Sequence, residues 1–110
     1  MALAKSVFVD KTEVVSFAST FSTNDHKTIQ VRTATSIRED GIELSKSFHR
    51  HTLPPGVVAA GSTTLTVTDV SGEDAGVQAI FNAVMTDEVK EAFRLYSVGI
   101  RSTRELINNP

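Results

Sequence analysis

The pattern of apolar and polar residues divides the chain into a strand-rich first part and a helical second part, with the change near Ser71. Residues 5–17 are rich in β-branched and aromatic residues and predict a strand that bends near Asp10. Residues 18–26 are mostly small and polar and predict a loop. We expect Phe21, the large apolar residue in this loop, either to anchor it to the core or to face a partner.

The clearest predicted element is a hairpin over residues 27–51. Apolar residues and threonines alternate with other residues from Ile29 to Arg38, which is the period of a strand. Asp40-Gly41 then predicts a two-residue turn, because glycine accepts the positive φ that this turn requires. Regular pairing across the turn places Ile37 opposite Leu44, Thr33 opposite Phe48 and Arg38 opposite Glu43.

The hairpin should end at Pro54 and Pro55, since proline cannot donate to a strand ladder. Apolar residues alternate with threonines over residues 63–69 and predict another strand, at a sheet edge. Its outward residues Thr64, Thr66 and Thr68 would then lie beside unpaired backbone groups, which a neighbouring chain can complete.

Helical spacing follows Ser71, which we expect to cap a first helix that carries Val77, Ile80, Phe81 and Val84. Residues 86–88 repeat the start signal, and Gly99 should end this second helix in a left-handed conformation. Residues 102–105 resemble a capping box for a short tail helix that carries Leu106 and Ile107. Together with Ile100, these residues give the tail more apolar content than a free end needs.

The elements predict an α+β fold: an antiparallel sheet of four to five strands with a central hairpin over 27–51, then two C-terminal helices and a short tail helix. The length of 110 residues fits one domain, 1–110, in which 99–110 is a candidate interface tail. A chain of this size can bury one core and has little material left for a deep substrate cleft.

Composition and charge narrow the expected partners. The net charge is -2, and the eleven basic residues are spread along the chain among acidic ones, so nucleic acid is not an expected partner. No apolar run approaches the roughly 20 residues of a membrane helix, and the N-terminus lacks a signal-peptide pattern. The absence of cysteine excludes disulfides, thiolate catalysis and cysteine-bound metals. We therefore expect a protein made in the cytoplasm, with no membrane partner.

Two groups of residues are candidates for a chemical site. His49 and His51 would point the same way from a strand and could hold zinc or copper, but Glu43 and His26 stand at no convincing spacing for a third ligand. The acidic pairs 39–40, 73–74 and 87–88 each fit a turn or a helix start, and nothing brings two carboxyls into one cleft. We predict no catalytic, cofactor or metal residues, and hence no enzyme.

The sequence also resembles a group of small proteins encoded by tailed bacteriophages. The resemblance covers roughly residues 10–93, and its segments are Asp10–Val14, Ile29–Thr35, Glu39–Ser45, Phe48–His51 with the following Pro-Gly, Ser71–Asp74, Val77–Ile80, Ala83–Val84 and Thr86. It implies association with virion structural genes and brings no site residues. The stretch 57–69 and the tail after Tyr96 depart from the pattern.

On this basis we expect a bacteriophage virion structural protein, a tail, neck or capsid-decorating subunit located in the virion, whose partners are itself and other virion proteins. Two alternatives stay open. One is the coat protein of a single-stranded RNA phage, which also runs from strands to C-terminal helices, although that fold uses more strands. The other is a small adaptor or regulatory domain outside the virion.

Overall fold

The computed structural model describes the backbone of residues 2–108 and the side chains of residues 2–101. The elements follow in the order β1 (Leu3–Phe17), β2 (His26–Glu39), β3 (Ile42–Leu53), β4 (Gly56–Val58), β5 (Leu65–Val67), α1 (Ala75–Val84) and α2 (Asp87–Asn108). Strands precede helices, so the predicted α+β class is confirmed.

The strands form two sheets, and the prediction of one sheet with four to five strands is wrong. β1, β2 and β3 make a long antiparallel sheet in that order, while β4 and β5 pair only with each other. The chain leaves the large sheet at Pro54 and Pro55, which have no N–H to donate. β5 then folds back onto β4 so closely that a side chain at Gly56 would overlap the carbonyl oxygen of Thr66.

The central hairpin forms as predicted, but its register does not continue regularly from the turn. Asp40 and Gly41 both have positive φ, at 51° and 83°. Arg38 pairs with Glu43 as expected, whereas the predicted pairs Ile37–Leu44 and Thr33–Phe48 are wrong; the observed pairs are Ile37–Ser45, Thr33–His49 and Ala34–Phe48. Leu44 is an extra residue in β3, a β-bulge, and one extra residue reverses the face of every side chain beyond it.

A second bulge lies in β1, where the bend was predicted. Val9 pairs with Thr33 and Lys11 with Arg32, so Asp10 is the extra residue. The two bulges lie in strands on opposite sides of β2, and each increases the local twist of the sheet.

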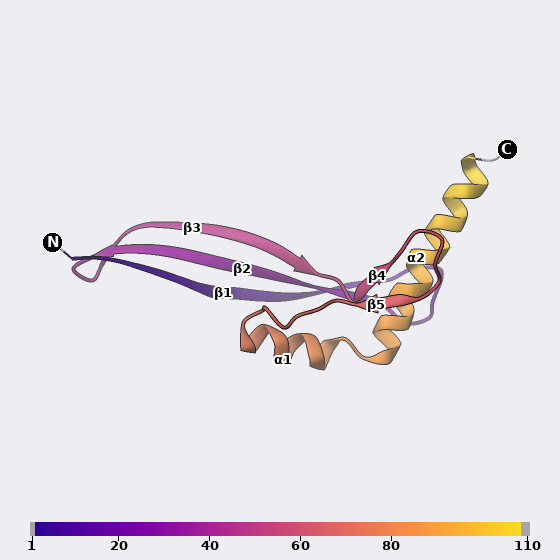
Figure 1. The fold of residues 1–110 in the computed structure, drawn as a ribbon, viewed down its shortest axis with the longest axis horizontal. Helices are drawn as coiled ribbons and strands as arrows, with labels where there is room; N and C mark the ends of the chain where they lie inside the picture. The colour runs from indigo at the N-terminus through magenta and orange to yellow at the C-terminus, as the bar shows by residue number, and fades with distance from the viewer. Residues whose placement is uncertain (1, 109–110) are drawn as a thin grey trace.

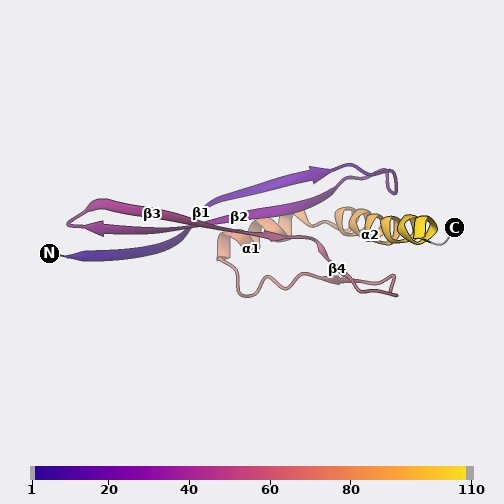
Figure 2. The ribbon, with the colours of Figure 1, turned by 90° about the horizontal axis from the view of Figure 1, so that it is seen from above.

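The hydrophobic core fills one half of the molecule. It joins Ile29, Val31 and Leu53 of the sheet to Val77, Phe81, Met85 and Val89 of the helical region. Figures 1 and 2 show the other half of the three-stranded sheet extending away from both helices, toward the N-terminus and the 40–41 turn. The molecule is accordingly elongated, with extents of 67 × 31 × 21 Å.

The helix boundaries correct three sequence predictions. α1 is capped by Asp74, whose side chain accepts from the N–H of Gly76, and not by Ser71. α2 runs through Gly99 to Asn108, so Gly99 does not end it and the tail is not a separate helix. Glycine at position 99 has a packing role instead: a side chain there would overlap the ring of Phe21, which anchors the 18–25 loop against α2. Within residues 2–108, neither helix is long and apolar enough to cross a membrane.

Candidate functional site

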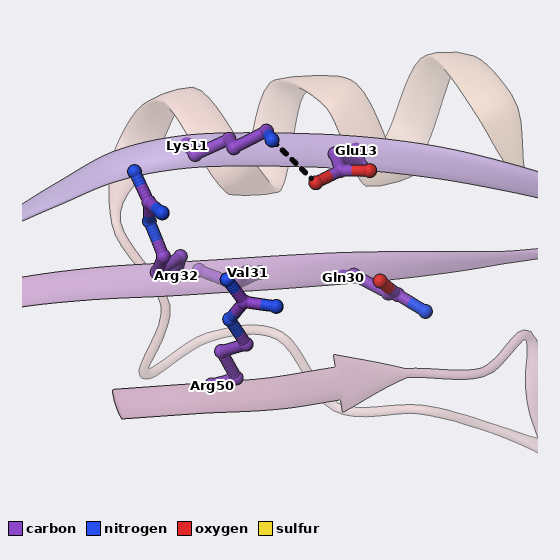
Figure 3. Close-up of a pocket in the computed structure, with 6 residues that line it drawn as sticks. All are labelled: Lys11, Glu13, Gln30, Val31, Arg32 and Arg50. Atoms are coloured by element: carbon purple, nitrogen blue, oxygen red, sulfur yellow. Dashed lines mark ion pairs between the residues drawn. The ribbon is translucent and has the colours of Figure 1, made fainter. Parts of the chain in front are cut away.

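The two faces of the large sheet differ in what covers them. Ile29 and Val31 point to the helices, so the side chains in alternate rows form a second surface, here called the helix-free face. The observed register assigns to it Phe8, Lys11, Glu13, Gln30, Arg32, Ala34, Ser36, Arg38, Glu43, Lys46, Phe48 and Arg50. Figure 3 shows part of this face, with α1 behind the sheet and a shallow hollow lined by Lys11, Arg32 and Arg50 among others.

Arg32 is held in a fixed position on this face. Its Nε and Nη2 donate to the two carboxylate oxygens of Asp10 at 3.0 and 2.7 Å. Its guanidinium carbon lies 4.2 Å from the ring centroid of Phe48, within cation–π range. The hydrogen bonds from Arg32 lower the pKa of Asp10, and the same bonds raise the pKa of Arg32. The bulge presents Asp10 to Arg32, and the pair orients a planar cation against an aromatic ring.

A second cation is shared by two aromatic rings. Lys46 Nζ lies 6.0 Å from the centroid of Phe8 and 5.7 Å from that of Phe48. Phe8 and Phe48 are paired with Ala34 from either side, and the small side chain of Ala34 is fully buried between them. Both phenylalanines nevertheless stay exposed, with residue exposures of 42% and 49%.

Charge is distributed unevenly between this face and the rest of the molecule. Five of the eleven basic residues lie on the helix-free face, with two of the thirteen acidic residues in its rows and Asp10 at its bulge. Arg32 is neutralised by Asp10, and Lys11 pairs with Glu13 at 3.0 Å. Among the described residues, Arg50 and Lys46 have no ion-pair partner and are exposed. The negative net charge of the chain thus conceals a locally basic surface.

The histidine pair lies on the other face. The rings of His49 and His51 stack with centroids 6.4 Å apart, as their spacing on a strand predicts. His51 Nε2 lies 2.6 Å from Oε1 of Glu73, which ties β3 to the segment before α1. Within the part of the chain that the structure describes, no cluster of three metal-type ligands occurs. His26, the third ligand that we considered, is buried at the far end of β2 against Phe17 and Tyr96.

The predicted interface residues lie in two regions of the helical end, the β5 segment and α2. Thr64 and Thr66 are exposed on and beside β5, while the Thr68 hydroxyl donates to the carbonyl of Pro54 at 2.7 Å. α2 is fastened to this region, because Arg94 donates to the Thr63 carbonyl and Arg101 to that of Ser62. Ile100 is half-buried on α2, and the side chains of Leu106 and Ile107 lie outside the described residues.

Sequence analysis missed an apolar surface at the opposite end of the molecule. Large apolar side chains there are exposed because no helix reaches them; we call Leu3, Val7, Ile37, Ile42 and Leu44 the uncovered apolar end. Their exposed fractions range from 36% to 70%. The strand pattern contained the residues, but it could not show that the helices stop halfway along the sheet.

Comparisons with protein-family models, with curated proteins and with solved structures found no match to this chain.

Proposed function

We propose that the protein is a structural subunit of a bacteriophage virion that works by assembling with a second copy of itself and with other virion proteins, and not by catalysis. The phage context comes from the sequence resemblance. The observation that supports assembly is the uncovered apolar end, together with the amount of surface that the single chain exposes.

The exposed area is larger than a compact chain of this mass requires. The accessible surface is 7209 Å². A folded monomer of 11.9 kDa is expected to expose about 5,900 Å². The radius of gyration, 18.8 Å, likewise exceeds the roughly 13 Å of a compact domain of 110 residues. The excess of about 1,300 Å² is more than the roughly 800 Å² that each partner buries in a stable complex.

The edges of the sheet offer a second means of association. Among the described residues, β1 and β3 each pair only with β2, so their outer edges carry unpaired N–H and C=O groups. Ile42 and Leu44 belong to β3, and their exposed fractions are 70% and 56%. An edge with neighbouring apolar side chains is suited to pairing with another strand, because backbone hydrogen bonds and apolar burial then form together.

A second copy accounts for these features without a further partner, since a two-fold axis brings the same apolar patch to both sides of the contact. The test is the mass in solution. The intact protein should have at least twice the 11.9 kDa mass of the chain by light scattering. The double variant Val7→Glu/Ile42→Glu should be a folded monomer, because a charge on this patch cannot be desolvated at a contact.

The matched control is Ala79→Glu/Ala83→Glu, which adds the same two charges to exposed positions of α1. It should keep the oligomer. A monomeric intact protein at high concentration, or an oligomer that persists in Val7→Glu/Ile42→Glu, would contradict the proposed assembly. Mass spectrometry of purified virions tests the phage part separately, since the chain should be among their proteins.

A further inference from the structure

We infer that the helix-free face binds single-stranded nucleic acid, a partner that the charge and spread of basic residues along the sequence did not favour. This inference does not depend on the proposed assembly. It rests on three observations: an alternation of cations and aromatic rings on β3, a fixed guanidinium plane on β2, and an excess of basic over acidic residues on this face.

The alternation on β3 places Lys46, Phe48 and Arg50 in successive rows of one face. Residues two apart on a strand are about 6.7 Å from each other, so the Cα atoms of Lys46 and Arg50 are about 13 Å apart with Phe48 between them. Phosphates need cations, and unstacked bases need flat apolar rings, so a single strand requires both within a short distance. A duplex hides its bases and would use only the cations.

Arg32 supplies a second stacking surface. Asp10 holds its guanidinium through two hydrogen bonds, and Phe48 supports it from one side at 4.2 Å. Guanidinium planes stack on bases much as aromatic rings do. Because the side chain is already ordered, a base that stacks on it costs less conformational entropy than it would on a free arginine.

Two exposed cations on this face can contact phosphates. Lys46 and Arg50 are exposed and have no ion-pair partner among the described residues. Ten of the thirteen acidic residues lie away from this face and its bulge. A segment of acidic residues alone could contact the two cations but would leave the exposed Phe8 and Phe48 uncovered, whereas a single strand supplies both phosphates and flat bases, so nucleic acid is the partner that we infer.

Fluorescence anisotropy with a labelled 20-nucleotide oligo(dT), an oligo(U) of equal length and a DNA duplex tests the inference. Both single strands should bind, and the affinity should fall as salt rises. The double variant Lys46→Gln/Arg50→Gln should lose at least tenfold in affinity. Its slope of log K against log salt should shrink by about 1.4, because each lost phosphate contact on a single strand contributes about 0.7.

The control variant is Lys5→Gln/Lys27→Gln, which removes the same charge from the other face of the sheet. It should bind nearly as the intact protein does. Phe48→Leu should lose about tenfold in affinity with an unchanged salt slope, since it removes stacking and no charge. Circular dichroism establishes that each variant is folded.

Several outcomes would overturn the inference. These are no binding at 50 mM salt, equal losses in the two charge variants, equal affinity for the duplex, or equal affinity for poly-glutamate, which would indicate an acidic protein partner. Light scattering on the same samples keeps this result separate from assembly: an oligomer that binds no oligonucleotide refutes the inference and leaves the proposed subunit role intact.

Discussion

Phe48 lies opposite Ala34 in the sheet, and not opposite Thr33, because Leu44 occupies a bulge between the turn and Ser45. This single extra residue puts Phe48 beside Arg32 on the helix-free face. Without it, Phe48 would lie in a row with Thr33 on the face that the helices partly cover.

Two single-residue deletions should distinguish the register with Phe48 opposite Ala34 from the register with Phe48 opposite Thr33. Deleting Leu44 removes the bulge and leaves Ser45–Leu53 on their present partners, so the fold and the Phe48–Arg32 contact should persist. Deleting His49 also gives a regular ladder, but it moves Phe48 opposite Thr33 while Leu53 stays in the core. Nuclear Overhauser effects between the Phe48 ring and Arg32 should be present in the first variant and lost in the second. Loss of the contact in both variants would contradict the assigned bulge.

The stability of the protein should depend on pH through His26. This side chain is 5% exposed among Phe17, Phe93 and Tyr96, and burial lowers its pKa. The unfolded chain therefore binds more protons than the folded one below the ordinary histidine pKa of about 6.5. The contribution of His26 to stability is fully present above that pH and is lost as the pH falls toward the lower pKa of the folded state. The loss is about 1.4 kcal/mol for each pH unit by which the folded pKa lies below the unfolded one.

Urea unfolding of the intact protein and of His26→Phe between pH 7.5 and 5 measures this contribution. The variant keeps an aromatic ring in the stack and removes a buried Nδ1 that has no hydrogen-bond partner. Its free energy of unfolding should fall less with decreasing pH. His49→Gln, at an exposed position, is the control and should follow the intact protein. Parallel curves for all three would mean that His26 does not titrate differently on folding.

Gly99→Ala should destabilise the protein although alanine is the better helix former. The ring of Phe21 lies where the new methyl group would be, so the ring must move. In a Phe21→Ala background the space is free, and the same substitution should stabilise α2 by up to about 1 kcal/mol. Thermal unfolding of the four proteins in this cycle gives the coupling. A stabilising Gly99→Ala in the intact background would refute the packing role of Phe21.

Removing residues 102–110 should leave a folded domain that still pairs through the uncovered apolar end, and it should weaken only the further association that the tail makes. The described contacts that fasten α2 to the body lie before the cut, and they include those of Arg101 with Ala59 and Ser62. The lost segment contains Leu106 and Ile107, which we predict to contact a partner. Circular dichroism and light scattering on the truncated chain measure the two effects. Unfolding of a truncated chain whose intact form is monomeric would make the tail part of the core instead.

The sequence predicted those features that depend on neighbouring residues. The Asp40-Gly41 turn, the extent of the hairpin and the bend at Asp10 follow from local conformational preferences, and the structure has all three. The bulge at Leu44 leaves no comparable signal, because nothing in its residue type marks it as extra. Since one residue reverses a strand's faces, this omission concealed the side on which Lys46, Phe48 and Arg50 gather.

Other differences come from contacts between distant parts of the chain. Gly99 has the pattern of a helix end, yet Phe21, far away in sequence, determines its role. The separation of β4 and β5 from the large sheet depends on where the chain turns after Pro55, which alternation does not encode. The candidate site was harder to predict than the fold, because the exposed part of the large sheet depends on where the two helices pack against it.

Because the helices cover only one half of the large sheet, the free energy needed to open its backbone hydrogen bonds should differ between the two halves. Amides near Ile29 and Val31 lie in the core, so their hydrogen exchange should require unfolding of the whole domain. Amides near the 40–41 turn are held only by the ladder and by the bond from Asp40 N–H to the Ala2 carbonyl, so they should exchange through brief fraying. A copy docked on the uncovered apolar end would slow that exchange, and the same strands that are loosest in the isolated chain would become rigid in the assembly.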